Sequence, residues 1–445
     1  MSEPTASAVP PFHDPELVAA VAAWMPGTRW YPMKGVEATW VLERAYDLGD
    51  DAAILLLRCD ETLLQVPVAW RDEQGQAPIA QLAGRWLVDG VHDERAVAAI
   101  VEATTGARAA EGLEGSLLGE APAAGGAMRV IEGEQSNTSV VGGDGAWIAK
   151  LFRVVAPGDN PDVVVTSALT GAGCARVPSL VGSLRATWSA GPEAFVTGHL
   201  VAVSRFVEGA EDAWELFLAH ASATARGEAE LELPDARALG EAVAQVHADL
   251  ADALGTAEAD EADLLRFVTG LEQRLAWARE EASEVLEELS DELAAAADRL
   301  REIEALGSLQ HIHGDLHLGQ VLRAGDGSWV LLDFEGEPLR PLHERMVREP
   351  RLRDVVGMLR SFDYAGGTAL RERADGDSDA TGAWVVERQR EFLAGYGSVA
   401  GEVDEHDPVF RALLLDKALY EVVYELRNRP SWVPVPLEAV RRLVT

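Results

Sequence analysis

Two aspartates bracket one short segment of the chain, and carboxylates placed in this way can do chemistry. Asp315 lies in the irregular stretch HIHGDLHLGQ, and Asp333 closes the apolar run WVLLDF. Between them Gly325-Asp326-Gly327 separates two short runs of strand-like composition, which predicts a β-hairpin. Because a hairpin brings its two ends together, we expect the two carboxylates to converge.

Converging carboxylates suit the transfer of a phosphoryl group from ATP. One carboxylate can orient the acceptor hydroxyl and take its proton, while the other binds Mg²⁺, which prefers carboxylate, water and phosphate oxygens. The alternative is that Asp315 and Asp333 only form turns, as aspartates often do. That alternative loses weight once the whole motif is counted.

A lysine at the end of a predicted strand is a candidate for nucleotide binding. Lys150 ends the alternating stretch AWIAK, from which it can reach the α- and β-phosphates. The turn before this strand occupies the place of a phosphate-covering loop, and it either cradles phosphate or is merely a polar turn. Its candidate phosphate-binding residues are Gln135, Ser136, Asn137 and Thr138.

The elements that must position these residues form three parts. Residues 211–445 read as a helical lobe that is interrupted once, by the hairpin. Helices are predicted there across the acidic stretch 259–306 and at 350–364, 381–396 and 408–427. Residues 126–210 read as a β-rich lobe with strands around Gly142–Gly145, a helix at 161–171 and a hairpin at 193–209.

Residues 1–125 read as a separate α+β module. A helix is predicted in PELVAAVAAWM, and a strand followed by a helix in GRWLVDGVHDERAVAAIVEATTG. Strands are predicted at 36–47, 51–58 and 62–70. The Gly- and Ala-rich segment 114–129 is expected to be a linker.

Composition limits the partners of the chain. With 74 acidic against 38 basic residues, the formal net charge of -36 disfavours nucleic acid and anionic membranes and tolerates a cationic substrate. The two cysteines, Cys59 and Cys174, are too few and too far apart for a disulfide scaffold or a thiolate zinc site. No signal peptide and no membrane-spanning run is readable, so we expect a cytoplasmic protein. We also expect a monomer.

At this point the chain resembles a known family. His313-Gly314-Asp315, Gln320 and Leu332–Glu335 resemble the Brenner-type motif of aminoglycoside phosphotransferases and related kinases. The string HGDLHLGQVL…LLDFEGEPLRPL…LRDVVGMLRSFDYA resembles the actinobacterial maltokinases, including their glucosamine kinase branch. The C-terminal DKALYEVVYELRNRPSWVPVPL and the N-terminal RWYPMKG resemble the same group. The resemblance covers the whole chain. It implies an α+β, protein-kinase-like bilobal fold preceded by an N-terminal cap domain.

The resemblance also implies roles for the motif residues. Asp315 is expected to be the catalytic base, Asp333 the main Mg²⁺ ligand, and Gln320 a second metal-side residue. Many relatives in the wider superfamily have asparagine at that last position. Glutamine carries the same carbonyl acceptor on one more methylene, so the contact of Gln320 with metal is expected to be indirect. For His317 two readings stay open, substrate binding and loop packing. His311 and His313 are expected to fix the loop through hydrogen bonds.

The nucleotide side departs from the family in one place. The superfamily lysine usually pairs with a glutamate on the following helix, whereas this chain has Asn160-Pro161-Asp162 there. Asp162 is interpreted as a helix N-cap, which leaves the acidic partner of Lys150 open. The adenine base is expected to contact the backbone of Ser204 and Phe206.

For the acceptor site, polar side chains recur near helical spacing towards the C-terminus. Glu421, Glu425 and Asn428 share a helix, and Trp432 follows the Pro430 break. Carboxylates and amides bind sugar hydroxyls, and an aromatic ring packs on the apolar face of a pyranose. The alternative is a solvated helix with a Lys417–Glu421 pair.

The sequence therefore predicts a sugar kinase that uses ATP and Mg²⁺. The preferred acceptor is glucosamine, giving glucosamine 6-phosphate, and the second candidate is maltose, giving maltose 1-phosphate. A catalytically silent pseudokinase that serves as a binding module would require loss of Asp315, Asp333 or Lys150, and all three are present. An antibiotic-resistance phosphotransferase is not expected to carry the cap.

Overall fold

The computed structural model describes residues 11–131, 136–191, 194–228, 231–337, 340, 342–372 and 376–444. Packing divides the chain into two compact units. The first comprises Met1–Ser167 with Pro178–Glu208, and the second Ala168–Val177 with Gly209–Thr445. Within the described ranges no helix is both long enough and apolar enough to cross a membrane.

The first unit begins with a helix and a five-stranded antiparallel sheet. The helix α1 (Pro15–Trp24) starts at Asp14, whose side chain accepts a hydrogen bond from the backbone of Glu16. The sheet has the order β1-β2-β3-β5-β4. Its strands are β1 (Val41–Gly49), β2 (Ala52–Cys59), β3 (Thr62–Arg71), β4 (Pro78–Leu82) and β5 (Arg85–Asp89). Strands β2 and β3 are buried along almost their whole length, as their continuous apolar sequence requires.

A second sheet of six strands completes this unit, in the order β6-β10-β11-β9-β8-β7. Its strands are β6 (Leu113–Leu117), β7 (Arg129–Val130), β8 (Thr138–Gly142), β9 (Trp147–Leu151), β10 (Leu180–Gly191) and β11 (Ala194–Arg205). The hairpin predicted at 193–209 is wrong, because that segment is the single strand β11, which pairs along its length with β10. The linker prediction is wrong for its first residues, since β6 pairs with β10 as an edge strand. Because β6 is mostly exposed, its sequence lacks the alternation of apolar and polar residues that predicts a strand.

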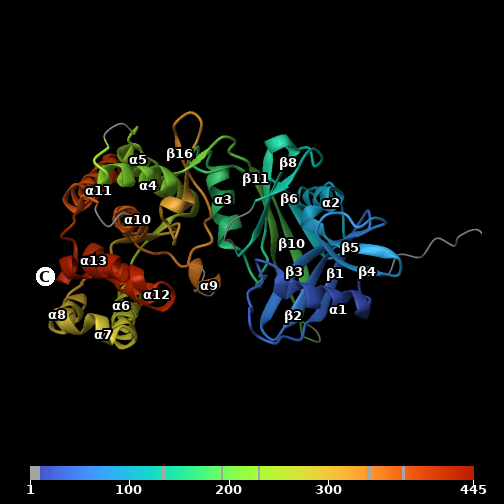
Figure 1. Ribbon diagram of the computed structural model, residues 1–445, viewed down its shortest axis with the longest axis horizontal. Helices are drawn as coiled ribbons and strands as arrows, with labels where there is room; N and C mark the ends of the chain where they lie inside the picture. The colour runs from blue at the N-terminus through green and yellow to red at the C-terminus, as the bar shows by residue number, and fades with distance from the viewer. Residues whose placement is uncertain are drawn as a thin grey trace, which may run out of the picture. The chain divides into compact units, whose positions relative to one another are not determined.

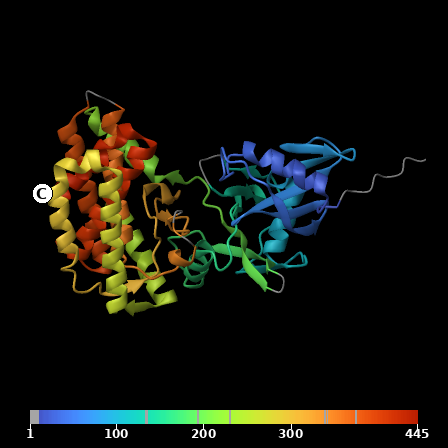
Figure 2. The ribbon, with the colours of Figure 1, turned by 90° about the horizontal axis from the view of Figure 1, so that it is seen from below.

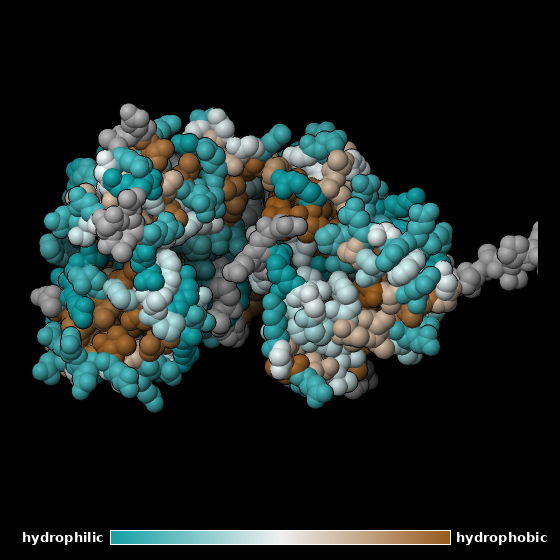
Figure 3. Space-filling view, in the orientation of Figure 1, coloured by the Kyte–Doolittle hydropathy of each residue, from teal (hydrophilic) through white to brown (hydrophobic). Residues whose placement is uncertain are grey.

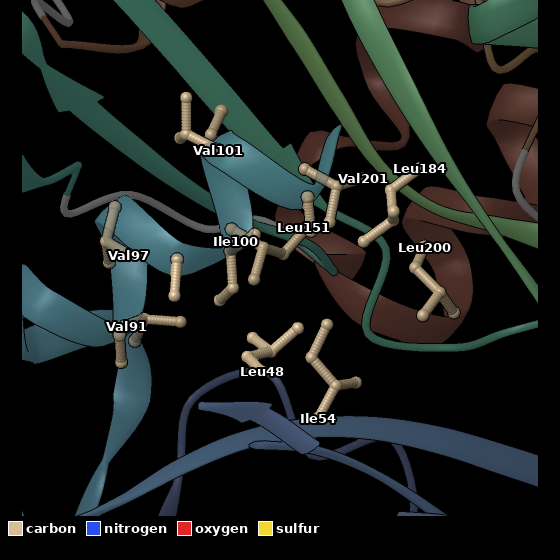
Figure 4. Close-up of a cluster of buried hydrophobic side chains, with 14 of the residues drawn as sticks. Leu48, Ile54, Val91, Val97, Ile100, Val101, Leu151, Leu184, Leu200 and Val201 are labelled. Carbon is tan, nitrogen blue, oxygen red and sulfur yellow. The ribbon is translucent and has the colours of Figure 1, made fainter. Parts of the chain in front are cut away.

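The two sheets share one hydrophobic core around α2 (Glu94–Thr104) (Figure 4). Ile100 of α2 lies near Leu48 of the first sheet and Leu151 of the second, and Val97 belongs to the same cluster. The predicted cap and β-rich lobe therefore pack as one body. Their predicted boundary at residue 125 stays a prediction, and β6 lies before it although it belongs to the second sheet.

The second unit is a helical bundle that carries two small sheets (Figure 1). One of them is the antiparallel pair β13 (Thr256–Glu258) and β14 (Ser308–Gln310), so the predicted helical lobe is interrupted more than once. Its long helices lie side by side (Figure 2), with α10 packed against α4, α11 and α12, and α5 packed along α11. The helices are α4 (Ala213–Ala225), α5 (Ala236–Leu254), α6 (Glu261–Glu281), α7 (Ser283–Leu286), α8 (Ser290–Leu300), α9 (Leu342–Arg345), α10 (Leu352–Arg371), α11 (Ser378–Ala400), α12 (Pro408–Asn428) and α13 (Pro434–Val444). The predicted late helices are present, while the acidic stretch is broken after Glu281 into shorter helices.

On the face shown in Figure 3 the second unit is hydrophilic over much of its surface and has a hydrophobic patch at its lower left. The predicted hairpin is also present, as β15 (Val321–Arg323) and β16 (Trp329–Leu331), and β12 (Glu211–Asp212) adds a third strand. This small sheet carries the loops of the candidate site at its ends.

Candidate active site

The hairpin joins the two loops that hold the predicted base and the predicted metal ligand. His313 Nε2 donates to the backbone oxygen of Leu332 at 2.7 Å, and the backbone N–H of Leu332 donates to the oxygen of Gln320 at 2.9 Å. His313 also packs on Phe334, with ring centroids 4.7 Å apart. The loop before β15 and the loop after β16 are therefore tied directly to each other. His313 has the structural role that the sequence predicted for it.

Asp354, which the sequence did not single out, anchors the loop of the predicted base. It lies in the first turn of α10 with 1% of its surface exposed. Its carboxylate accepts hydrogen bonds from the backbone N–H groups of His313 (2.7 Å) and Gly314 (2.9 Å), the two residues before Asp315. His247 Nε2 of α5 lies 3.0 Å from the same carboxylate. Burial alone would raise the pKa of Asp354, but these partners outweigh it and hold the pKa below its ordinary value.

Asp333 adopts a backbone conformation that L-residues rarely use. Its φ is +62°, in the left-handed region, which costs energy unless surrounding contacts enforce it. A carboxylate oxygen of Asp333 and one of Glu335 lie within 4.8 Å of each other, a spacing that one divalent cation can bridge. Gln320 meets Asp333 Oδ2 through its amide nitrogen, at 3.5 Å. In this orientation Gln320 supports the carboxylate rather than offering an oxygen to metal, and its predicted role stays a prediction.

Lys417, on α12, faces the predicted base. Its Nζ lies 3.6 Å from Asp315 Oδ1 and 3.6 Å from Glu337 Oε1, and about a quarter of each of the three side chains is exposed. Burial alone would lower the pKa of the Lys417 ammonium, but the two carboxylates outweigh burial and the pKa is raised. Lys417 therefore remains a cation beside the predicted base.

His317 takes part in the turn that leads into the hairpin. Its Nδ1 accepts a hydrogen bond from the backbone N–H of Gly319 at 3.1 Å, so it caps the short 3₁₀ turn Leu318–Gln320. Burial lowers the pKa of His317, although the nearby Asp315 carboxylate opposes this. This geometry matches the loop-packing reading, and substrate binding by His317 stays a prediction.

The predicted sugar-binding glutamates of α12 are buried and bonded to protein donors. Glu421 Oε2 accepts hydrogen bonds from Arg360 at 2.8 and 2.7 Å. Glu425, with 1% exposed surface, accepts from the hydroxyl of Tyr364 at 3.1 Å and from Arg429 at 2.6 and 2.9 Å. The alternative of a solvated helix is therefore wrong for these two positions, because the helix packs them against α10.

The other two predicted sugar-binding residues lie at and just beyond the end of α12, Asn428 as its last residue and Trp432 in the 3₁₀ turn that follows. The Asn428 amide nitrogen donates to the backbone oxygen of Tyr424 at 2.8 Å. The Trp432 ring packs against the guanidinium groups of Arg371 and Arg429, at 4.9 and 4.8 Å. No contact with a sugar follows from these positions alone, and both roles stay predictions.

On the β-rich unit, Lys150 has an acidic partner on the following helix. Lys150 Nζ lies 2.9 Å from Asp162 Oδ2, and both side chains are largely buried. The N-cap interpretation of Asp162 is wrong, because the helix α3 (Pro161–Gly171) is capped by Asn160, whose Oδ1 accepts from the backbone N–H of Asp162 at 2.9 Å. Asp162 is thus the acidic partner of Lys150, which the sequence left open.

The predicted phosphate-covering turn is described only in part. Gln135 lies outside the described residues, and Ser136 is exposed. Asn137 and Thr138 are buried, where Asn137 Oδ1 accepts from the backbone of Arg153 at 3.3 Å and Thr138 Oγ1 from its Nε at 2.8 Å. Arg153 therefore holds this end of the turn in place.

The predicted adenine-binding segment ends β11. Ser204 pairs with Ile148 of β9, and the backbone N–H of Phe206 donates to the oxygen of Ala146 at 3.4 Å. The contact of this segment with a nucleotide stays a prediction.

Sequence reasoning missed Asp354, Asp162 as an ion-pair partner, Glu335 and Lys417. Glu335 and Asp354 lie within the strings that carry the family resemblance, LLDFEGEPLRPL and LRDVVGMLRSFDYA, but the sequence assigns them no role. The partners of Asp354 and Lys417 are remote in sequence, so only the folded chain shows their contacts. One signal was readable for Lys417, since the chain has only three lysines, Lys34, Lys150 and Lys417, against 35 arginines.

A β-rich unit with a lysine–carboxylate pair and a helical unit with an aspartate-bracketed hairpin define a kinase-like phosphotransferase. The Phosphotransferase enzyme family model matches residues 193–396, and the Maltokinase N-terminal cap domain model matches residues 24–93. The predicted fold class is confirmed.

Curated relatives and solved structures match most of the chain. A glucosamine kinase from Streptacidiphilus jiangxiensis is 32% identical over 440 residues, 95% of each chain. A glucosamine kinase from Mycolicibacterium smegmatis is 31% identical over 71% of this chain and 79% of the relative. The solved structure of a glucosamine kinase in complex with glucosamine, ADP and inorganic phosphate superposes with a TM-score of 0.74 at 27% identity, covering 97% of this chain and 100% of that one. The chain belongs to the family of these kinases, the capped phosphotransferases that also include the maltokinases.

Proposed function

We propose that this protein transfers the γ-phosphoryl group of ATP to the 6-hydroxyl of glucosamine, with Mg²⁺ as cofactor. The observation that carries the proposal is the match to a glucosamine kinase, at 32% identity over 95% of both chains. The site agrees with it, because each residue type needed for phosphoryl transfer is present and supported by neighbours.

The residues of the chain have the following roles in this proposal. Lys150, held by Asp162, binds the nucleotide phosphates. Asp315 orients the acceptor hydroxyl and takes its proton, and the Asp354 hydrogen bonds keep its loop in place. Positioning and electrostatic stabilisation are most of what an enzyme can add to phosphoryl transfer.

The residues near Asp333 fit a magnesium ion. Asp333 and Glu335 present carboxylate oxygens close together, as a hard cation requires. When bound, Mg²⁺ neutralises charge on the phosphate oxygens. Gln320 holds Asp333 by its amide and contributes to the metal only indirectly.

The preference for an amino sugar rests on charge. The amine of glucosamine is partly protonated near neutral pH, and a carboxylate beside it forms a charge-assisted hydrogen bond that glucose cannot form. Such a bond contributes about 1.5–3 kcal/mol, which corresponds to a preference of roughly 10- to 150-fold. Glu421 and Glu425 are the proposed carboxylates, and binding would require them to exchange their contacts with Arg360 and Arg429 for contacts with the sugar.

The test compares glucosamine, glucose and maltose at fixed ATP and Mg²⁺, with ADP release as the readout. Glucosamine should have the highest kcat/KM. The comparison is repeated with Glu421→Gln and Glu425→Gln, each of which should reduce the preference for glucosamine over glucose. Efficient phosphorylation of maltose with glucosamine inert would overturn the proposed substrate in favour of maltose 1-phosphate formation. An unchanged preference in both variants would remove the two glutamates from sugar recognition.

A further inference from the structure

The use of lysine in this chain is unusual and points to one residue. Of 38 basic residues, 35 are arginines, so each of the three lysines stands out. Lys34 is exposed. The other two lysines, Lys150 and Lys417, are largely buried against carboxylates. Lys150 lies at the proposed nucleotide site, whereas the proposed mechanism gives Lys417 no role.

Lys417 bridges two acidic side chains from different segments. Its Nζ lies 3.6 Å from Asp315 Oδ1 and 3.6 Å from Glu337 Oε1, so these two oxygens are at most twice that distance apart. Two carboxylates this close repel each other unless a cation lies between them. The contact also involves Oδ1 of Asp315, which leaves Oδ2 available to an acceptor hydroxyl.

The space around Lys417 explains why arginine does not replace it. Asp315, Glu337 and Lys417 line a cavity of about 10 Å³, together with Arg353, Asp354 and the backbone of Gly314. That volume holds about one water molecule. A lysine ammonium is a compact point charge that fits between two carboxylates, whereas a planar guanidinium is larger and favours side-on contact with a single carboxylate.

We propose that Lys417 is a positioning residue for the phosphoryl transfer, which holds the Asp315 carboxylate in one orientation by bridging it to Glu337. This inference rests on the proposed role of Asp315 as the base. Without the ammonium, Asp315 and Glu337 repel each other, and the base turns away from the acceptor hydroxyl. The residue acts through Asp315 and is not itself a catalytic residue.

The test is a set of substitutions at Lys417 with a matched control at exposed Lys34. Lys417→Met, which is similar in length and uncharged, should lower kcat by about 10- to 100-fold, a part of the 10²- to 10⁴-fold effect of a positioned base. The KM for ATP should stay within about twofold, since Lys417 does not act on the nucleotide. Lys417→Arg should not restore kcat, although it keeps the charge. Lys34→Met should behave as the wild type.

Chemical rescue separates positioning from a general loss of structure. In Lys417→Ala, added ethylammonium should enter the vacated space and restore part of kcat, while tetramethylammonium, which cannot donate a hydrogen bond, should not. The unfolding midpoint of each variant is measured alongside. If Lys417→Met does not fold, Lys417→Gln provides the uncharged variant.

Three results would overturn the inference: a wild-type kcat in Lys417→Met, full activity in Lys417→Arg, or a folded Lys417→Ala that ethylammonium does not rescue. The ratio of variant to wild-type kcat is measured with whichever sugar the wild type accepts best. The substrate proposal is tested by comparing kcat/KM among the three sugars, and the Lys417 inference by the ratio of variant to wild-type kcat. Each can therefore fail without the other.

Discussion

Replacing Asp354 by asparagine should weaken both the fold of the helical unit and the reaction, although Asp354 makes no contact with a reacting group in the proposed mechanism. In the wild type its Oδ2 accepts from His313 and His247, and its Oδ1 accepts from Gly314. An asparagine amide keeps one oxygen and replaces the other with an NH₂ group. In its better orientation the amide oxygen serves His313 and His247, and the Gly314 N–H then faces another donor.

The expected cost follows from that single lost acceptor. A hydrogen bond to a charged group contributes about 1.5–3 kcal/mol, so the free energy of unfolding should fall by that amount in Asp354→Asn. Asp354→Ala leaves all three donors without an acceptor and should cost about 3–5 kcal/mol. Because Gly314 precedes Asp315 directly, a displacement near 1 Å of the base is expected to lower kcat by about 10²-fold.

Denaturant unfolding and steady-state kinetics measure the two effects. Asp379→Asn, an exposed residue in the first turn of α11, is the matched control for loss of one negative charge and should leave both unchanged. A fully active Asp354→Asn with the wild-type unfolding midpoint would refute the reasoning, since it would show that the base loop keeps its conformation without this anchor.

Three further predictions follow from the same geometry. Asp315→Asn should keep nucleotide binding and lower kcat by at least ~10²-fold. Near wild-type turnover of this variant would show that the base is misassigned. Asp333→Ala should abolish Mg²⁺-dependent nucleotide binding, measured by calorimetric titration. Lys150→Met and Asp162→Asn should both raise the KM for ATP and leave the KM for the sugar nearly unchanged, and a change confined to the sugar constant would place the pair outside the nucleotide site. Burial, assisted by Arg185, lowers the pKa of His199 from 6.5 to about 4. As the pH falls, the unfolded chain therefore binds this proton before the folded chain does. The contribution of neutral His199 to the free energy of unfolding is fully present above pH 6.5 and falls by up to about 3 kcal/mol towards pH 4. Unfolding measured across that range should show a smaller loss for His199→Gln, and equal slopes would contradict the assignment.

Much of the architecture was predictable because it depends on short-range patterns. The helices near 352–371, 378–400 and 408–428 follow from the spacing of apolar residues, and the hairpin between the two aspartates follows from its turn residues. The errors fall where that information is weak. Strand β6 lies at an edge and is mostly exposed. The sequence predicts a hairpin in place of β11 because the pairing of this long strand with β10 depends on a partner that no local pattern indicates.

The sequence by itself determined which residues were candidates for the chemistry, because Asp315, Asp333 and Lys150 belong to short motifs whose residue types and spacing carry the information. Only the tertiary structure decided what holds them. The local pair of Lys417 with Glu421, the alternative to a sugar site on this helix, does not form. Lys417 contacts Asp315 and Glu337 instead, and Glu421 contacts Arg360. The partners of Asp315 and Glu421 lie some 60 to 100 residues away along the chain. Packing of α12 against α10 and the base loop brings such charges within reach, and a buried charge pairs with whatever opposite charge packing places beside it, whatever its distance in sequence.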